Sequence, residues 1–360
     1  MAGNSFGQLF KITTFGESHG GAVGVVVDGC PPGIEISKEE IQAELDRRRP
    51  GQSALTTPRK EADEIHILSG HFEGKTTGTP LMMCAYNTDA RSQDYNHMNH
   101  AFRPGHADYT YIQKYGFRDW RGSGRASARE TLARVAAGAI AQKYLKERHG
   151  IEIVSFVETV GSITAHVDLT VVTRAACEVN DVRCPDVHTA ANMISLIETV
   201  RDAGDSIGGV IRTVVRNVPA GLGEPVFDKL HADLGKGMLS INAVKGFEIG
   251  SGFAGVSMRG SEHNDLFVKN ADGTITTKTN HAGGVLGGIS SGQPLEFRTA
   301  FKSVSTIKKS QDTVHEDGNT VTIEGTGRHD PCVLPRAVPI VDAMTALVLM
   351  DHVLRNKSLH

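Results

Sequence analysis

Residues 20–34 read GGAVGVVVDGCPPGI, and residues 208–222 repeat the same plan as GGVIRTVVRNVPAGL. Each copy opens with a glycine pair, continues as a run rich in valine and closes on a proline and glycine turn. A β-branched run bounded by such turns predicts a strand, and the apolar residues beyond each turn recur at helical spacing. The match therefore predicts a duplicated β-α unit, at about residues 20–50 and 208–238.

The helices that follow the two copies carry start signals of their own. Ser37 and Glu40 form a capping box, which predicts a helix over residues 38–49 that ends at Pro50. In the second copy we expect Pro225 at the first helical position, where a missing N–H group costs nothing.

The glycine-poor middle of the chain predicts the longest helices. Ser127 and Glu130 form a second capping box, which predicts a helix that continues to about residue 148. The alanines around Gly138 permit close packing of this helix against a neighbour.

Two further segments, residues 186–201 and 340–354, show apolar residues at helical spacing. No Pro-rich or Ser-rich linker interrupts the chain. We therefore expect a single domain over residues 1–360, of the α+β class, with helices packed against mainly antiparallel strands.

Composition excludes several classes of protein. The 360 residues include 38 Lys+Arg and 41 Asp+Glu, a formal charge of −3, which excludes a strongly basic nucleic-acid binder. The 5 cysteines are odd in number and form no Cys-x-x-Cys pair, so we expect neither a disulfide framework nor a zinc cluster. A metal site made of His97, His100, His106 and Asp108 is an alternative, but their spacing matches no standard ligand set. Residues 1–10 do not resemble a signal peptide, and no apolar run is long enough to span a bilayer. We expect a cytoplasmic protein without a metal, a membrane segment or a nucleic-acid partner.

Residues 16–20, GESHG, match the letters of the Gly-x-Ser-x-Gly elbow of serine hydrolases. That elbow has to lie between a strand and a helix, whereas residues 21–28 predict another strand. A second interpretation makes His19 the working group, on a turn whose glycines let a ligand approach the backbone. A glycine-rich hairpin with a surface histidine is the third. The hydrolase hypothesis predicts covalent labelling of Ser18 by a fluorophosphonate.

Residues 103–108, RPGHAD, precede a run of arginines that ends with Arg125 and Arg129 on either side of Ser127. Guanidinium groups and the free N–H groups of a helix N-terminus then converge, which suits phosphate or carboxylate. The alternatives are a solvated, salt-bridged surface and a non-catalytic scaffold that binds anions or RNA.

Two Gly-Gly pairs within residues 281–288 precede a Lys/Ser/Thr cluster at residues 302–306. Backbone amides and hydroxyls in this pattern suggest a phosphate-bearing cofactor, but neither a dinucleotide fingerprint nor a Walker loop is present. The residues by themselves indicate an anion-binding enzyme with His and Asp available for proton transfer. They name no reaction.

Residues 16–20 (GESHG), 103–108 (RPGHAD), 125–130 (RASARE) and 327–332 (GRHDPC) resemble, in this order, the signature segments of the chorismate synthase family. The resemblance implies a lyase of the shikimate pathway of aromatic amino acid biosynthesis. It would form chorismate by 1,4-elimination of phosphate from 5-enolpyruvylshikimate 3-phosphate, with reduced FMN as cofactor and NADPH as one candidate reductant. It also implies a helical layer sandwiched between two antiparallel sheets, internal duplication and a homotetramer.

The resemblance further implies roles for individual residues. His19 would protonate or steady the flavin, His106 would donate a proton to the departing phosphate, and Asp330 would help to remove a proton through the flavin. Substrate contacts are implied for Arg48, Arg103, Arg129 and Arg134. FMN contacts are implied for Arg125, Ala126, Ser127, Asn242, Ala243, Gly287, Lys302, Ser303, Val304, Ser305, Thr306 and Arg328.

Two positions depart from the family pattern. Ala54 stands where many members carry a basic residue, often Arg, and Arg59 or Lys60 would have to replace that anion contact. Ser303 stands where relatives often have Pro, which leaves Lys302 and the neighbouring hydroxyls in place.

Overall fold

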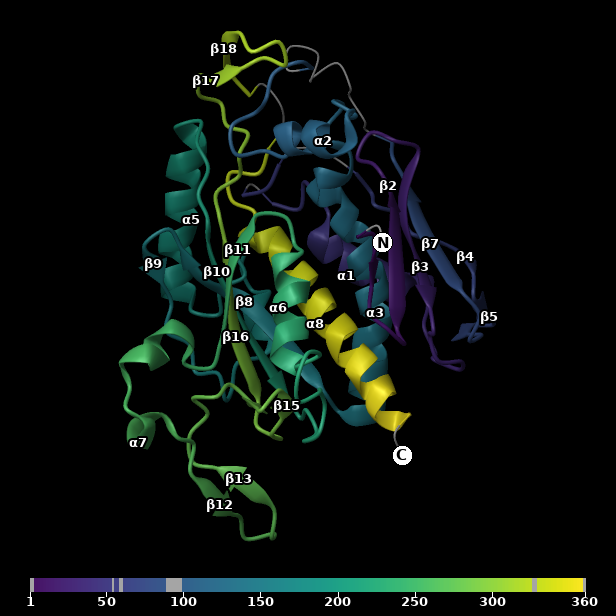
Figure 1. Ribbon diagram of the computed structural model, residues 1–360, viewed down its shortest axis with the longest axis vertical. Helices are drawn as coiled ribbons and strands as arrows, with labels where there is room; N and C mark the ends of the chain where they lie inside the picture. Colours follow the sequence, from purple (N-terminus) through teal and green to yellow (C-terminus); the bar gives the residue numbers. More distant parts are fainter. Residues whose placement is uncertain (1–2, 54, 58–60, 89–98, 326–328, 359–360) are drawn as a thin grey trace.

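The computed structural model describes residues 3–53, 55–57, 61–88, 99–325 and 329–358. A layer of helices lies at its centre, with a five-stranded antiparallel sheet on either side (Figure 1). The α+β class and the helical layer between two sheets are therefore confirmed.

Each of the two large sheets has five strands, which are named in their spatial order. The first contains β1 (Ser5–Phe6), β2 (Lys11–Gly16), β3 (Ala22–Asp28), β7 (Leu81–Tyr86) and β4 (His66–Ser69). The second contains β9 (Ile163–Thr164), β8 (Glu152–Val160), β10 (Gly209–Arg216), β16 (Leu295–Phe301) and β11 (Val244–Ile249).

Four helices form the central layer: α1 (Lys38–Arg48), α3 (Thr131–His149), α6 (Leu230–Leu239) and α8 (Leu334–Lys357). α3 packs against β2 and β3, α8 packs against β8 and β10, and the two helices lie along each other. The other helices are α2 (Asp108–Tyr115), α4 (Arg174–Cys177), α5 (Val187–Asp202), α7 (Gly260–His263), η2 (Gly124–Ala126), η3 (Ala128–Glu130) and η4 (Gly252–Ser257). The hairpins are β5 (His71–Phe72) with β6 (Lys75–Thr76), β12 (Phe267–Lys269) with β13 (Ile275–Thr277), β14 (Val285–Leu286) with β15 (Ile289–Ser290), and β17 (Gln311–Val314) with β18 (Thr320–Ile323).

One arrangement of strands and helices occurs twice. In the first unit β2 and β3 precede α1, β4 and β7 follow it, and α3 closes the unit. In the second unit β8 and β10 precede α6, β11 and β16 follow it, and α8 closes the unit. The repeated valine runs form β3 and β10, the central strands of the two sheets. The duplicated β-α unit is therefore confirmed.

The contact between α3 and α8 depends on small side chains. Gly138 of α3 faces Ala343 of α8, and both residues are buried. A Cβ atom built on Gly138 would lie 2.4 Å from the Cβ atom of Ala343 and 2.7 Å from its Cα atom. The close packing predicted for this alanine-rich helix is therefore confirmed, because no larger side chain fits at Gly138.

We expect Gly138→Ala to lower the free energy of unfolding by about 1–3 kcal/mol, because the new methyl group forces two helix backbones apart. Alanine has a higher helix propensity than glycine, by about 1 kcal/mol, but this gain offsets only part of the steric cost. Gly237→Ala in α6 is the control, since its Cβ atom would meet Val348 at an ordinary 3.4 Å. Urea unfolding measures the free energy of unfolding of both variants. Equal stabilities would contradict the close contact of α3 and α8 at Gly138.

The first predicted capping box is present and the second is not. Ser37 Oγ accepts a hydrogen bond from the Glu40 N–H group, and α1 spans nearly the predicted range. Ser127 Oγ accepts instead from the Arg129 N–H group, so a turn of 3₁₀ helix precedes α3. The prediction at Glu130 was wrong because its carboxylate is engaged elsewhere, by side chains of β2 and α3.

Two predicted helix starts were also wrong. α6 begins at Leu230 rather than Pro225, because the Glu224 N–H group donates to the Asp228 carbonyl and closes a turn before the helix. α8 begins at Leu334, ahead of the expected residue 340. Its interior proline, Pro339, cannot donate to the carbonyl four residues earlier.

That carbonyl belongs to Pro335, and it accepts a hydrogen bond from Arg183 Nη1 instead. The helix therefore continues through Pro339 without a buried unsatisfied acceptor at this point. The predicted helix at residues 186–201 is confirmed, as α5, with the Asp186 carboxylate capping its first N–H groups.

α8 also corrects the expectation that no segment could span a bilayer. By length and composition it is the one described helix long and apolar enough to do so. In the folded chain, 94% of its most apolar 18-residue stretch is buried. Its apolarity is therefore used in packing against α3 and the second sheet.

Candidate functional site

A cavity of about 360 Å³ lies where α1 ends and where α3 and α8 begin. Its size falls in the range of small-molecule sites. Chain segments far apart in the sequence contribute its wall. The predicted site residues that line it are Arg48, Arg103, His106, Ala126, Ser127, Arg129, Asn242, Ala243, Lys302, Val304, Ser305, Thr306 and Asp330.

Five predicted site residues do not line this cavity, and Arg328 lies outside the described residues. Arg125 donates to Thr14 and to the Gly16 carbonyl of β2. Arg134 donates to Glu130 at 2.9 Å and to Ser240 Oγ at 2.7 Å, which ties α3 to the end of α6. The other three are His19, Gly287 and Ser303.

His19 lies just behind the cavity wall. A Cβ atom on Gly122, which lines the cavity, would lie 1.9 Å from His19 Nδ1. Gly122 has a φ of +65°, so both its backbone conformation and the contact require glycine. This glycine lets the His19 ring lie against the wall.

Gly287 lies in a turn and Ser303 in an irregular segment, and neither residue lines the wall. Gly287 forms the turn of the β14–β15 hairpin, at the opposite end of the second sheet from α2 (Figure 1). Ser303 follows Lys302, whose Nζ donates to its carbonyl at 3.1 Å.

Ser18 is buried, and its Oγ lies 3.1 Å from His19 Nδ1. β2 ends at Gly16 and β3 begins at Ala22, so Ser18 lies in a turn between two strands. The strand-to-helix context of a hydrolase elbow is therefore lacking, as the sequence indicated.

One buried carboxylate organises the cationic side of the cavity around His106. Asp108 accepts from Arg103 Nε and Nη2, both at 2.7 Å, and Arg118 Nη1 lies 3.1 Å away. His106 Nδ1 lies 3.1 Å from the same carboxylate. Such a contact orients an imidazole ring and defines which nitrogen faces the ligand.

Burial dominates the ionisation of His106. It lowers the pKa of the ring below its usual range, although the hydrogen bond to Asp108 acts in the opposite direction. Burial alone would raise the pKa of Asp108, but its hydrogen bonds to Arg103 and His106 outweigh burial and hold that pKa far below the usual range. Asp108 is therefore a permanent anion beside a histidine that is readily deprotonated.

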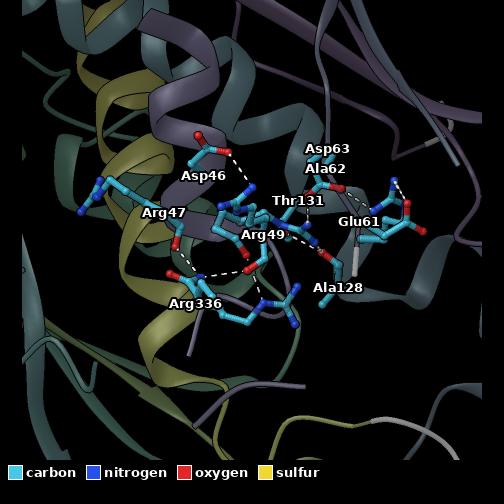
Figure 2. A network of polar contacts seen from close by, with 12 residues as sticks. Asp46, Arg47, Arg49, Glu61, Ala62, Asp63, Ala128, Thr131 and Arg336 are labelled. Atoms are coloured by element: carbon cyan, nitrogen blue, oxygen red, sulfur yellow. Dashed lines mark hydrogen bonds and ion pairs between the residues drawn. The ribbon is translucent and has the colours of Figure 1, made fainter. Parts of the chain in front are cut away.

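A second buried carboxylate, Asp63, holds two cavity arginines together (Figure 2). Its Oδ2 lies 3.0 Å from Arg48 Nη1, and its Oδ1 lies 2.6 Å from Arg129 Nη1. Arg48 also donates to Thr131 Oγ1 and to the Ala128 carbonyl. The two guanidinium groups are therefore held in position before any ligand binds.

Burial lowers the pKa of Arg48 to about 10 even though Asp63 opposes the change. Asp63 adopts a left-handed backbone conformation, with φ +49°, which is uncommon for a residue other than glycine. Sequence patterns did not indicate Asp63, because it lies in no motif and acquires its role only through contact with two distant arginines.

Asp330 is held from two sides. The Thr57 N–H group donates to Oδ1 at 2.8 Å, and Arg336 Nη1 donates to Oδ2. Arg336 comes from the first turn of α8, lines the cavity and also donates to the Arg48 carbonyl. Sequence reasoning missed Arg336 as a site residue, although its position six residues after Asp330 at a helix start was a usable signal.

The opposite wall carries hydroxyls and one lysine. Lys302 Nζ donates to Ser305 Oγ at 2.6 Å, and Ser305 Oγ donates to the Gly105 carbonyl at 2.7 Å. Asn242 donates to the Ala126 carbonyl at 2.9 Å, while its Oδ1 is buried without a partner. This wall can bind a phosphate through Lys302 and offers an amide oxygen to a donor on a ligand.

Comparison with known proteins identifies the family of this chain. The family model described as "Chorismate synthase" matches residues 10–354. The chorismate synthase of Trichodesmium erythraeum is 59% identical over 98% of this chain and 96% of its own length, and that of Opitutus terrae is 61% identical over 99% and 98%. A solved structure titled "Crystal Structure of Chorismate Synthase" has a TM-score of 0.74 and 30% identity, covering 98% of this chain and 93% of that chain. The chain therefore belongs to the chorismate synthase family of lyases.

Proposed function

We propose that this protein converts 5-enolpyruvylshikimate 3-phosphate to chorismate and phosphate, with reduced FMN as cofactor, in the shikimate pathway. The observation that carries the proposal is one cavity in which several cations surround His106 and Asp330. The substrate has a phosphate and two carboxylates, and arginine forks suit both kinds of group. The proposed substrate contacts are Arg48, Arg103 and Arg129, with Arg134 supporting α3 from outside the cavity.

The leaving group is the phosphate, and His106 is the proposed proton donor to it. Asp108 orients the ring through Nδ1, so Nε2 is the nitrogen that faces the ligand. Arg103, engaged by the same carboxylate, supplies a positive charge beside the position of the phosphate. A general acid in this position assists departure of the phosphate oxygen.

Asp330 is proposed to help in the removal of a proton from the substrate ring. Arg336 and the Thr57 N–H group hold both of its oxygens, which defines where the carboxylate faces. His19, held by Ser18 on the far side of Gly122, is proposed to steady or protonate the flavin.

The cavity residues fit a flavin mononucleotide. Lys302, Ser305 and Thr306 offer a cation and hydroxyls for its phosphate, and Asn242 offers a buried, unpartnered amide oxygen for a ring or ribityl donor. Ala243 has a φ of +68°, an uncommon backbone conformation of the kind that clusters at ligand sites. When bound, reduced FMN supplies an electron transiently and recovers it, so the reaction involves no net redox change.

We also propose a cytoplasmic homotetramer. An arm made of η4, α7, β12 and β13 extends away from the body of the molecule (Figure 1). It exposes large apolar side chains, including Phe253 at 79%, Val256 at 85% and Phe267 at 66%. Exposed apolar groups of this size suit a contact with another subunit. Sedimentation equilibrium tests this proposal, and a purely monomeric protein would contradict it.

The decisive assay is anaerobic incubation of the purified protein with the substrate and chemically reduced FMN. We expect chorismate and phosphate in equal amounts, and no turnover with oxidised FMN. A parallel reaction with oxidised FMN and NADPH tests whether the protein reduces its own flavin. Absence of product with reduced FMN would refute the proposal, and fluorophosphonate labelling of Ser18 would instead favour a hydrolase.

A further inference from the structure

Buried polar atoms without a partner mark positions where a ligand or water has to supply one. Among the described residues, three buried atoms without a hydrogen-bond partner belong to side chains that line the cavity: Asn242 Oδ1, His329 Nε2 and Arg129 Nη2, the last of which lies 3.8 Å from a carboxylate oxygen of Glu61. Family resemblance implies ligand contacts for Arg129 and Asn242. The same structural observation thus singles out His329, for which the resemblance implies no role.

His329 lies directly before Asp330, in a strongly cationic environment. Burial, and then the positive charge of Arg103, lowers the pKa of its ring to about 4, with Asp330 acting in the opposite direction. His106 and Lys308 contribute to the lowering. The ring is therefore neutral at physiological pH, with a hydrogen on one nitrogen and a lone pair on the other.

We propose that His329 is a substrate-binding residue whose neutral ring donates a hydrogen bond from Nε2 to a phosphate oxygen of the ligand, beside Arg103 and His106. The nearby cations attract an anionic oxygen to this part of the cavity, and such an oxygen favours the tautomer with hydrogen on Nε2. The identity of the phosphate ester rests on the proposed function, whereas the anion contact rests on the cavity itself.

A neutral donor has a specific advantage in this position. Arg103 already supplies a full positive charge, and the proposed proton donor is His106. A further cation would bind the product phosphate more tightly and slow its release, whereas a neutral N–H group adds one directional hydrogen bond. His329 therefore adds selectivity for an oxygen at a defined position rather than additional charge.

The test is calorimetric titration of the purified full-length protein with inorganic phosphate. His329→Leu removes the donor, and we expect its dissociation constant to rise about 10- to 100-fold, the range for one hydrogen bond to a charged acceptor. His329→Gln places an amide N–H group close to the position of the original Nε2. We expect it to stay within about threefold of the wild type.

His149 provides a matched control. Its Nε2 is also buried without a partner, and its pKa is also lowered by burial, but it lies at the end of α3 and does not line the cavity. His149→Leu should therefore leave the dissociation constant of phosphate unchanged. Thermal unfolding of all three variants verifies that each is folded.

Three results would overturn the proposal: no phosphate binding by the wild type, equal phosphate affinities for His329→Leu and the wild type, or clearly weaker phosphate binding by His329→Gln than by the wild type. A pH series from 6 to 8 gives a further test. If the wild type gained affinity on acidification and His329→Gln did not, His329 would bind as a cation rather than as a neutral donor. Because phosphate binding needs no turnover, a failed chorismate assay with an intact His329 effect would refute only the proposed reaction.

Discussion

Replacing His106 with alanine is expected to lower kcat for chorismate formation by about two to four orders of magnitude, the usual loss when a general acid is removed. Its ring lines the cavity and is oriented by the buried Asp108 carboxylate at 3.1 Å. Flavin and substrate should still bind, because Arg103 and Lys302 remain in place. Steady-state and single-turnover kinetics measure the loss.

His106→Asn is the informative control. Its amide can occupy the position of Nδ1 and donate to Asp108, but it cannot transfer a proton. We expect the same loss of kcat as for alanine, with stability close to that of the wild type. A near-normal rate in either variant would show that His106 has a structural role only.

The lowered pKa of His106 predicts the shape of the pH profiles. A proton donor acts in its protonated form, so kcat/KM, which reports the free enzyme, should fall as pH rises through this lowered pKa. In the substrate complex the phosphate charge favours the imidazolium and raises its pKa. The fall of kcat with rising pH should therefore lie at higher pH than the fall of kcat/KM. If the two fell at the same pH, this would contradict the assignment of His106 as the proton donor.

Asp108→Asn is expected to lower the free energy of unfolding by about 3–5 kcal/mol, the usual cost of removing one partner of a buried ion pair. The variant removes the carboxylate that faces Arg103 and Arg118, whose side chains are only 4% and 6% exposed, and leaves Arg118 with Glu316 at 3.6 Å. The pKa of Asp108 is depressed in the folded protein, so its carboxylate stabilises the fold above the pKa of the unfolded chain.

This contribution is lost as pH falls through the acid range. The stability difference between wild type and Asp108→Asn should be complete at neutral pH and shrink below about pH 4. Asp119→Asn is the matched control, because Asp119 also binds an arginine through both oxygens, but Arg121 is 46% exposed. We expect a loss of less than about 1 kcal/mol there, and equal losses for the two variants would contradict the argument from burial.

Secondary structure was predictable where the signals are local. The capping box at Ser37 and Glu40 needs only neighbouring residues, and α1 forms nearly as predicted. The box at Ser127 failed because the Glu130 carboxylate finds Thr14 and Arg134 instead. A partner from β2 competes with the local cap, and no pattern within the helix reveals it.

The candidate site was predictable in part for a similar reason. Residues in motifs, such as His106 and Lys302, line the cavity. Asp63 and Arg336 belong to no motif and were missed, although they hold Arg48 and Asp330 in position. Their importance comes from contacts across long sequence separations.

The amino-acid sequence is sufficient to identify the family, the repeated β-α unit and the cationic residues that an anionic substrate needs, because motifs and hydrophobic periodicity are local properties of the chain. Tertiary structure decides which charges meet. Packing of α3 along α8 brings the arginines of one unit to the start of a helix from the other, and burial there lowers the pKa of His106 and His329. Proximity and dielectric environment depend on the folded chain as a whole, so no local pattern contains them.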